Sequence, residues 1–497
     1  MTRPAGEEPS TLSPRMNPKV AVSVVFVAAM FMSIMDATIV NVALPTIGRD
    51  FRVTPTAVGT ISIAFLVSLA VFIPASGWLG DRFGAKRILL GAIAVFTAAS
   101  ALCGTATSLA ELVGFRVLQG VGGGMLAPVG LAMLFRAFPP RERVRASAIL
   151  TVPTTFAPAL GPVVGGLLVT DLSWRWVFYV NVPIGVVAIA FGAVFLGHQP
   201  QKRPGPFDLP GFLLSGTGLG SLMYGVSEGP GLGWGSRYVV ATIVAGVLLL
   251  GATVAVEMRT SEPIVALRLL GNRLFRSGNV VMALVSVSFF GTLFGISLYY
   301  QDGRGLTALA SGLSTFPEAI GVMAGAQLAT RYLYPRLGPR RHITIGLVTV
   351  SIVTALISLL GASASLWWAR LLMFALGLGM GQVFVPTQAA SFATISPEAT
   401  GRASTLFNAV RQLGGAVGVA LLTTAIVVVG PTRVVGGHLV PHFLAYRVAF
   451  LVSAAFSLCA TVGSLSIRDS EAAQTMVRRR RAAASDAAGP DLTATGK

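Results

Sequence analysis

The stretch that decides the fold reads LVGFRVLQGVGGG at residues 112–124 and APALGPVVGG at residues 157–166. It predicts two apolar helices joined by a basic turn at residues 138–143. Arg116 stands alone in the first helix. An arginine at the centre of a membrane helix costs about 3 kcal/mol, so it is usually paired or functional. The glycines and prolines of the second helix are tolerated in lipid, where neighbouring helices satisfy the backbone.

The composition indicates a protein that crosses the membrane many times. Of the 497 residues, 54% are hydrophobic and 11% are charged, whereas soluble domains are about a quarter charged. The net charge of +18 does not indicate nucleic-acid binding, because the basic residues lie between the apolar runs. That distribution follows the positive-inside rule, which places Lys and Arg on the cytoplasmic side of a membrane.

The apolar runs predict about fourteen transmembrane helices. They are expected at residues 19–47, 57–78, 86–106, 109–136, 144–169, 174–197, 208–227, 237–257, 275–301, 308–330, 342–361, 365–394, 401–429 and 442–467. Placing the N-terminus inside puts most Lys and Arg residues in the cytoplasm. Both polar tails, residues 1–18 and 469–497, are then cytoplasmic, and the second is expected to be disordered.

An internal repeat divides the chain into two halves. Each copy has an arginine, a later proline in the same helix, and an R-A-S sequence after a cytoplasmic turn: Arg116, Pro128 and Arg145 in the first, Arg370, Pro386 and Arg402 in the second. We expect two six-helix bundles at 19–200 and 263–468, with two inserted spans at 201–262. A substrate site between such halves is typical of secondary transporters.

Four motifs then carry a resemblance over nearly the whole chain. They are MDATIVNVALPTI at 35–47, GWLGDRFGAKR at 77–87, RVLQGVG at 116–122 and GPVVGG at 161–166. The sequence resembles the major facilitator superfamily, and within it the 14-spanner drug:proton antiporters of the EmrB/QacA type. The resemblance implies an all-α integral membrane protein with the major facilitator fold, two six-helix bundles plus two extra helices between them.

Asp36 and Arg116 are the first candidates for proton coupling. Counted from the outer helix ends at 1.5 Å per residue, they lie at similar depths of about 14–16 Å. The sequence does not determine whether they face each other. Ionisable residues within membranes often form proton relays, and we expect Asp36 to exchange protons under the influence of Arg116. The alternative is a static pair that locks two helices together.

The loop after the second span is a candidate cytoplasmic gate, formed by Gly77, Asp81, Arg82, Gly84 and Arg87. A solvated turn would explain the basic residues but not the acid among them. A carboxylate at a helix end, or paired with an arginine of another helix, can hold one conformation. The resemblance implies that such a latch closes the cytoplasmic side.

Gly161, Pro162, Gly165 and Gly166 form the motif that the resemblance associates with antiporters. Small residues let helices approach closely. Beyond packing, we expect a glycine and proline kink where the two halves meet, allowing one half to rock against the other.

The remaining candidates lie in the second half and in the fourth span. Glu318 lies about ten residues into its span. We expect it to line a cavity, where it would bind protons or cationic drugs. The alternative is a residue near the membrane surface that reaches water. Arg411 and Gln119 are candidate cavity residues. Arg370, the repeat partner of Arg116, is expected to be an interfacial anchor near the outer end of its helix.

These features predict a bacterial inner-membrane multidrug exporter that is not an enzyme. No G-x-x-x-x-G-K-[ST] motif for ATP is present, and no metal or other cofactor is expected, so the proton gradient would drive export. The expected partners are small drugs, protons and membrane lipid, without nucleic acid, and the expected oligomeric state is a monomer. The alternatives are an exporter of one metabolite, a proton-coupled importer, and a non-transporting membrane sensor or assembly partner.

Overall fold

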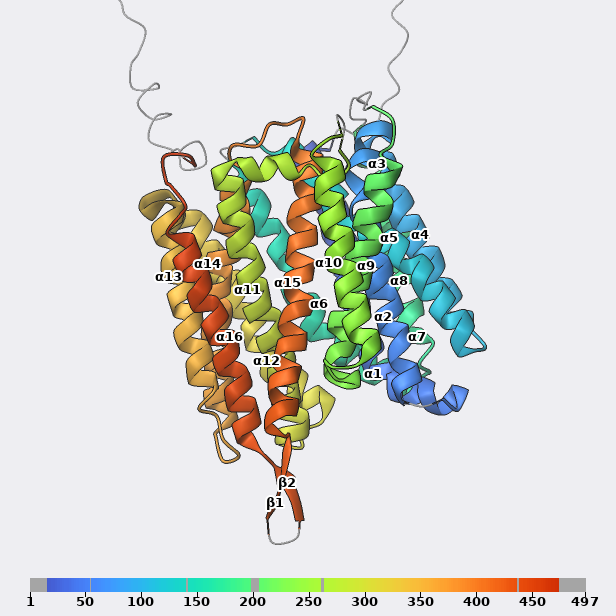
Figure 1. Ribbon diagram of the computed structural model, residues 1–497, viewed down its shortest axis with the longest axis vertical. Helices are drawn as coiled ribbons and strands as arrows, with labels where there is room; N and C mark the ends of the chain where they lie inside the picture. Colours follow the sequence, from blue (N-terminus) through green and yellow to red (C-terminus); the bar gives the residue numbers. More distant parts are fainter. Residues whose placement is uncertain are drawn as a thin grey trace, which may run out of the picture.

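The computed structural model describes residues 16–53, 55–139, 142–197, 205–260, 263–435 and 438–472. Most of them are helical, and one β-hairpin projects from one end (Figure 1). The first elements are α1 (Pro18–Phe51), α2 (Pro55–Phe72), α3 (Ala75–Phe83), α4 (Ala85–Thr105), α5 (Leu109–Ala137), α6 (Arg143–Asp171), α7 (Trp176–Tyr179) and α8 (Asn181–Phe195). Two further helices, α9 (Leu209–Leu232) and α10 (Arg237–Glu257), follow them.

The rest of the chain begins with the 3₁₀ turn η2 (Leu267–Gly271) and contains the π turns η3 (Tyr299–Gly303) and η4 (Ala329–Leu333). Its helices are α11 (Arg273–Leu298), α12 (Ala308–Leu328), α13 (Tyr334–Ile357), α14 (Leu366–Ser391), α15 (Thr400–Val429) and α16 (Phe443–Ser464). The strands β1 (Thr432–Val435) and β2 (His438–Pro441) pair antiparallel between α15 and α16, with Thr432 opposite Pro441.

The helix starts follow from local chemistry. Side-chain oxygens accept hydrogen bonds from the first backbone amides at several starts, among them Ser108, Asp208, Asn272 and Thr307. Such caps satisfy amides that have no partner within the helix. Prolines inside α5, α12 and α14 do not end these helices, as expected where neighbouring helices compensate in a membrane.

The predicted count of fourteen spans is not confirmed. Among the described residues, ten helical stretches are long and apolar enough to cross a membrane, or eleven if the bent pair α2 and α3 is one span. Helix α9, which is rich in glycine and small polar residues, is not among them. Helix α6 is described only in part, so this count does not include it. Residues Leu309–Ile357 count as a single stretch, because η4 continues α12 into α13, and within this stretch the helical backbone breaks at Gly338, with a φ of 75°.

Two groups of helices pack in the same pattern. Helix α1 contacts α5, α6 and α8, and α11 contacts α14, α15 and α16 in the same way. Likewise α5 contacts α2 and α4, whereas α14 contacts α12 and α13. We call α1–α8 the N-terminal half and α11–α16 the C-terminal half. The predicted domain boundaries stay a prediction, and most of both predicted tails lies outside the described residues.

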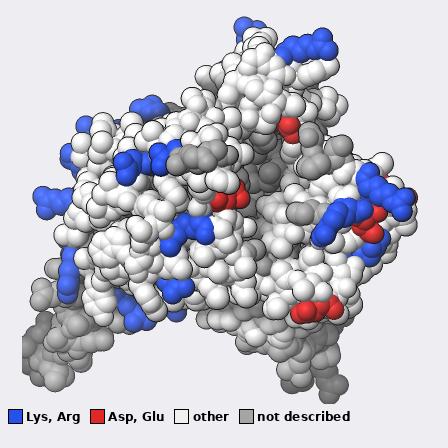
Figure 2. Space-filling view, turned by 90° about the horizontal axis from the view of Figure 1, so that it is seen from below, with Lys and Arg blue, Asp and Glu red and all other residues white. Residues whose placement is uncertain are grey.

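The two ends of the molecule differ. At the end where α1 begins, α16 ends and α3 lies (Figure 1), α3 and α5 of the N-terminal half pack against α15 of the C-terminal half. We call this the α3 end and the opposite one the hairpin end. Seen from the hairpin end, the surface is hollowed between two lobes (Figure 2). The structure is therefore closed at the α3 end.

Candidate functional site

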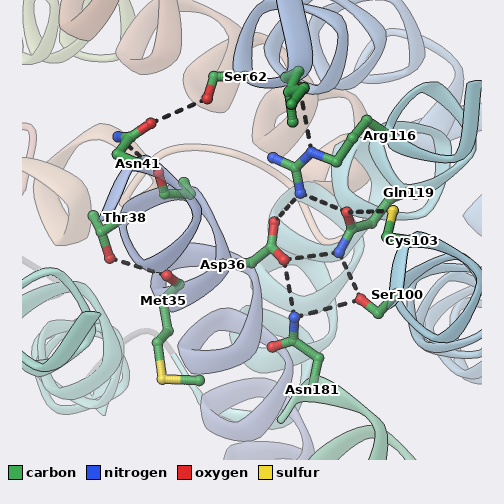
Figure 3. A network of polar contacts seen from close by, with 12 residues as sticks. Met35, Asp36, Thr38, Asn41, Ser62, Ser100, Cys103, Arg116, Gln119 and Asn181 are labelled. Carbon is green, nitrogen blue, oxygen red and sulfur yellow. Dashed lines mark hydrogen bonds and ion pairs between the residues drawn. The ribbon is translucent and has the colours of Figure 1, made fainter. Parts of the chain in front are cut away.

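Asp36 is the centre of a buried polar network inside the N-terminal half. Its side chain, on α1, is fully buried, and three donors surround its carboxylate (Figure 3). Arg116 Nη1 donates to Oδ2 at 2.5 Å, and Gln119 Nε2 donates to Oδ1 at 2.9 Å. Asn181 Nδ2 donates to Oδ1 at 2.9 Å. Such donors favour the charged form of a carboxyl group.

Arg116 is held as firmly as its acid partner. It is 1% exposed, and its Nη1 also donates to Gln119 Oε1 at 2.5 Å. Its Nε donates to the carbonyl oxygen of Ile61 at 3.3 Å, and its guanidinium lies 4.2 Å from the centre of the Phe65 ring. Removing one partner of a buried ion pair costs about 3–5 kcal/mol, because the other charge is left uncompensated.

The network joins four helices of one half. Ser100 of α4 accepts hydrogen bonds from Gln119 at 2.6 Å and from Asn181 at 3.4 Å. The sequence reasoning placed Asp36 and Arg116 at one depth, and the structure brings them into contact. It assigned Gln119 to a cavity, whereas Gln119 lies within this network. It missed Ser100 and Asn181, although Asn181 is a polar residue at the start of an apolar run.

The predicted gate contains one ion pair. Asp81 of α3 is 6% exposed, and it accepts a hydrogen bond from Arg136 Nη2 of α5 at 2.7 Å. Arg82 and Arg87, which were predicted to belong to the gate, are exposed. Gly84 ends α3 with a φ of 89°, a conformation that favours glycine. Sequence reasoning missed Arg136, because it lies 55 residues along the chain from its partner.

The gate region touches the other half of the molecule. A side chain at Gly77 would lie 2.9 Å from Thr405 Oγ1 and 3.3 Å from the carbonyl oxygen of Gly401, so the two backbones approach closely at this point. Ser76 Oγ and Thr405 Oγ1 are 3.1 Å apart and share a hydrogen bond. The Asp81 carboxylate also lies beside Gly401, in the first turn of α15, where the helix dipole favours an anion.

A second contact between the halves was not predicted. Arg143, at the start of α6, is 4% exposed and donates through Nη1 to the carbonyl oxygen of Phe392. Phe392 caps the C-terminal end of α14, and a cation is favoured at such an end. The rings of Phe135 and Phe392 also lie 4.7 Å apart across the halves. Sequence reasoning counted Arg143 only as a basic loop residue.

The position predicted for the antiporter motif is corrected by the structure. Side chains at Gly161 and Gly165 would overlap or crowd Thr38 and Ile39 of α1. These glycines therefore face a helix of the same half, not the other half. The reason is that Gly161 and Gly165, one turn apart, form a smooth helix face that accepts the branched side chains of α1. Gly166 has open space around it, and the side chain of Pro162 lies outside the described residues.

Glu318 differs from Asp36 in every contact. It is 3% exposed on α12, and its Oε1 has no hydrogen-bond partner among the described residues. The backbone of α14 touches α12 at this level, where Gly377 packs against the carbonyl of Glu318. A buried carboxylate without a partner is costly, so the neutral acid is favoured.

The two candidate arginines of the C-terminal half have different surroundings. Arg411 is half-buried on α15, and no hydrogen bond or ion pair joins it to another described residue. Arg370 lies over the ring of the exposed Trp367, at 4.9 Å, and its Nη2 is 3.5 Å from Ser314 Oγ. Within the described part of the chain, no three His, Cys, Asp or Glu residues could hold a metal ion together.

The sequence profile and the related sequences both indicate one family of transporters. The sequence profile of the Major Facilitator Superfamily matches residues 26–419. The chain is 33% identical over 407 residues to the Multidrug resistance protein B homolog of Mycobacterium tuberculosis, covering 80% of this chain and 74% of that protein. It is 32% identical over 404 residues to the Tetracenomycin C resistance and export protein of Streptomyces glaucescens, covering 81% and 74%.

The solved structures agree on the fold. The human organic anion transporter MFSD10 superimposes with a TM-score of 0.64 at 15% identity, covering 90% of this chain and all of that one. Members of this family are transporters and not enzymes, as the motifs predicted. The chain is an integral membrane protein with the all-helical fold of these proteins. It belongs to the major facilitator superfamily.

Proposed function

We propose that this protein is a multidrug exporter that exchanges protons for amphipathic or cationic drugs across the bacterial cytoplasmic membrane. The observation that carries the proposal is the contrast between two buried acids. Asp36 has three donors around its carboxylate, whereas Glu318 Oε1 has no partner among the described residues. A transporter driven by protons needs an acid whose charge state changes with its surroundings, and burial provides that sensitivity.

The closed α3 end assigns this conformation to one state of the transport cycle. The contact of α3 and α5 with α15 and the hollow at the hairpin end support an outward-facing conformation, with the α3 end in the cytoplasm. In this state three donors surround the Asp36 carboxylate, and Glu318 is the acid to which we assign the exchanged proton. The halves at 19–200 and 263–468 then rotate against each other, so that the α3 end opens to the cytoplasm. Drug binding in this inward-facing state displaces the proton from Glu318 to the cytoplasm.

The energy available is sufficient for this exchange. One charge moving through 100 mV provides about 2.3 kcal/mol, which supports a concentration ratio of about fifty for a neutral solute. We assign proton exchange to Glu318, a fixed electrostatic centre to the ion pair of Asp36 and Arg116, and drug contact to Arg411. The cycle requires no bound cofactor.

A drug-susceptibility panel tests the proposal. The chain is expressed in a host that lacks its own drug pumps, with and without a proton uncoupler, and resistance to cationic dyes and neutral drugs is measured. We expect raised resistance to several unrelated compounds and its loss with the uncoupler. Resistance that survives the uncoupler would remove proton coupling from the proposal.

A second candidate is export of one dedicated compound. One relative, 32% identical, is named for resistance to and export of tetracenomycin C. The same panel distinguishes the two functions, because a dedicated exporter would protect against one chemical scaffold only.

A further inference from the structure

Helix α9 lies against both halves of the molecule, and α10 packs on α9. The halves meet along two seams, one where α3 and α5 contact α15 and one where α6 contacts α12 and α14. Helix α9 packs against α2 of the N-terminal half and α15 of the C-terminal half. In Figure 1 the green helices α9 and α10 lie in front of α2, and α9, which contacts both α2 and α15, covers the first seam.

The contact of α9 with α2 is close. A side chain at Gly216 would lie 2.9 Å from the carbonyl oxygen of Val71, and one at Gly220 would lie 3.0 Å from Val71 Cγ2. These glycines are one turn apart, a spacing that lets two membrane helices approach through their backbones. The rings of Phe72 and Phe212 extend the contact, with their centres 5.9 Å apart.

Near the α3 end the same contact continues. The ring of Trp78, on α3, lies 4.9 Å from that of Phe207, just before α9. Trp78 Nε1 also donates to the carbonyl oxygen of Gly205 at 3.1 Å. Helix α9 is thus held by the N-terminal half along a long face, through glycine contacts, aromatic rings and a hydrogen bond.

Helix α10 is fixed to α9 in turn. Gly246 of α10 packs against the backbone of Leu222, and Gly225 of α9 packs against Ile243. A side chain at Gly246 would lie 2.8 Å from Leu222 N, and one at Gly225 would lie 3.2 Å from Ile243 N, so the two helices approach closely and form one unit. A rigid unit of this kind moves as a whole when its attachment moves.

Helix α9 also packs against α15, but among the described residues no glycine of either helix makes a close approach to the other. Trp234, in the turn between α9 and α10, donates through Nε1 to Thr424 Oγ1 at 2.7 Å. Trp234 is 37% exposed, and a single hydrogen bond at such a site contributes little net free energy. Such a bond is readily broken and remade as two helices slide past each other.

We propose that α9 and α10 form a wall fixed to the N-terminal half, which slides along α15 and keeps the seam between α2 and α15 closed to lipid throughout the cycle. This inference rests on the proposed function, because it requires the halves to move. The role of the inserted helices α9 and α10 is then to close one side of the moving interface. On the other side α6 and α12 contact each other directly.

Cysteine cross-linking tests the wall. Cys459 is first replaced by serine, and the buried Cys103 is kept. The first pair joins α2 to α9, the contact proposed to be fixed, and combines Val71→Cys with Gly220→Cys. The second pair joins the turn after α9 to α15, the contact proposed to slide, and combines Trp234→Cys with Thr424→Cys. A control pair at the seam between α6 and α12 combines Phe156→Cys with Phe316→Cys, whose rings lie 6.0 Å apart.

After bridging with a short bifunctional thiol reagent, ethidium efflux by the protein with the 71–220 link is expected to stay within about twofold of efflux by the unbridged protein, because a fixed contact does not change during the cycle. The 234–424 and 156–316 links are expected to stop efflux. Loss of efflux with the 71–220 link, or normal efflux with the 234–424 link, would overturn the wall. If the 71–220 pair fails to insert, Phe72→Cys with Phe212→Cys replaces it.

A readout without transport separates the wall from the proposed function. Membranes are equilibrated from acidic to alkaline pH, and each bridging yield is divided by the yield of labelling the same cysteines with a monofunctional thiol reagent, because the thiolate fraction itself rises with pH. The wall predicts a constant yield for 71–220 and changing yields for 234–424 and 156–316. A 71–220 yield that changes in step with 156–316 contradicts the wall. Absent ethidium efflux in the unbridged parent chain contradicts the proposed function instead.

Discussion

The two halves each bury an acid, and they treat it in opposite ways. Asp36 is surrounded by Arg116, Gln119 and Asn181, whereas Glu318 Oε1 is unpartnered among the described residues. The first arrangement stabilises a charge and the second opposes one. The difference teaches that similar burial does not imply a similar role: we assign Asp36 to a fixed electrostatic centre and Glu318 to proton exchange.

The largest effect is expected from Asp36→Asn. The change leaves Arg116 buried without its counterion, which lowers the free energy of unfolding by about 3–5 kcal/mol. Efflux of ethidium driven by a pH gradient in inverted vesicles should be abolished. Asp50→Asn, on the same helix in a partly exposed ion pair, is the matched control and should retain efflux. Unchanged efflux with Asp36→Asn would falsify the role of this centre.

The double change of Asp36→Asn with Arg116→Gln sharpens the comparison. Removing both charges of a buried pair is often neutral for stability, so thermal unfolding of the purified protein should recover most of the loss. Efflux should stay abolished if the charges act in transport. Recovery of both stability and efflux would make the pair a structural lock, the alternative that the sequence left open.

A selective effect is expected from Glu318→Gln. Proton-driven export of all drugs should fall, because the variant carries no exchangeable proton, and export of cationic drugs should fall further, because the drug's charge also loses this acid. Stability should be unchanged, since the variant removes no hydrogen bond to Oε1 among the described residues. The exposed Asp302 provides the control, Asp302→Asn. An equal loss for both drug classes removes Glu318 as a charge selector.

The gate should contribute less than either acid. Arg136→Gln breaks the ion pair with Asp81 and should reduce efflux by about tenfold, within the range of one to three kcal/mol typical of conformational coupling. Arg82→Gln, which removes an exposed arginine nearby, should stay within about twofold of the unchanged chain. Equal effects of the two variants would assign the loss to general surface charge.

The smallest effect is expected at the edge of the Asp36 network. Ser100→Ala removes an acceptor for Gln119 and Asn181 without touching the carboxylate. A net loss of about 1 kcal/mol in stability is typical of one such hydrogen bond. Thermal unfolding measures it. A loss as large as that of Asp36→Asn would mean that Ser100, and not the ion pair, holds the network.

The sequence predicted the family and the residues with unusual chemistry, because a charge in an apolar helix is visible without a structure. Asp36, Arg116, Asp81 and Glu318 were all found in this way. It did not predict which of these side chains contact residues of other helices. Arg136 and Asp81 come from different helices, and no spacing along the chain reveals which faces meet.

Local geometry was also missed where the pattern was ambiguous. The connection predicted between residues 330 and 342 is shorter than expected, because η4 continues α12 into the start of α13 and the helical backbone breaks only at Gly338, with a φ of 75°. Gly161 and Gly165 were placed at the contact between halves, but they face α1. A smooth glycine face shows that some helix approaches closely, not which one.

The most direct test measures which acid holds a proton. Infrared difference spectra of the purified protein at neutral pH detect the carbonyl stretch of a protonated carboxyl group. The account predicts that Glu318→Gln removes this band and that the band persists in the double variant of Asp36→Asn with Arg116→Gln. A band that survives Glu318→Gln and disappears with the Asp36 variant would contradict it.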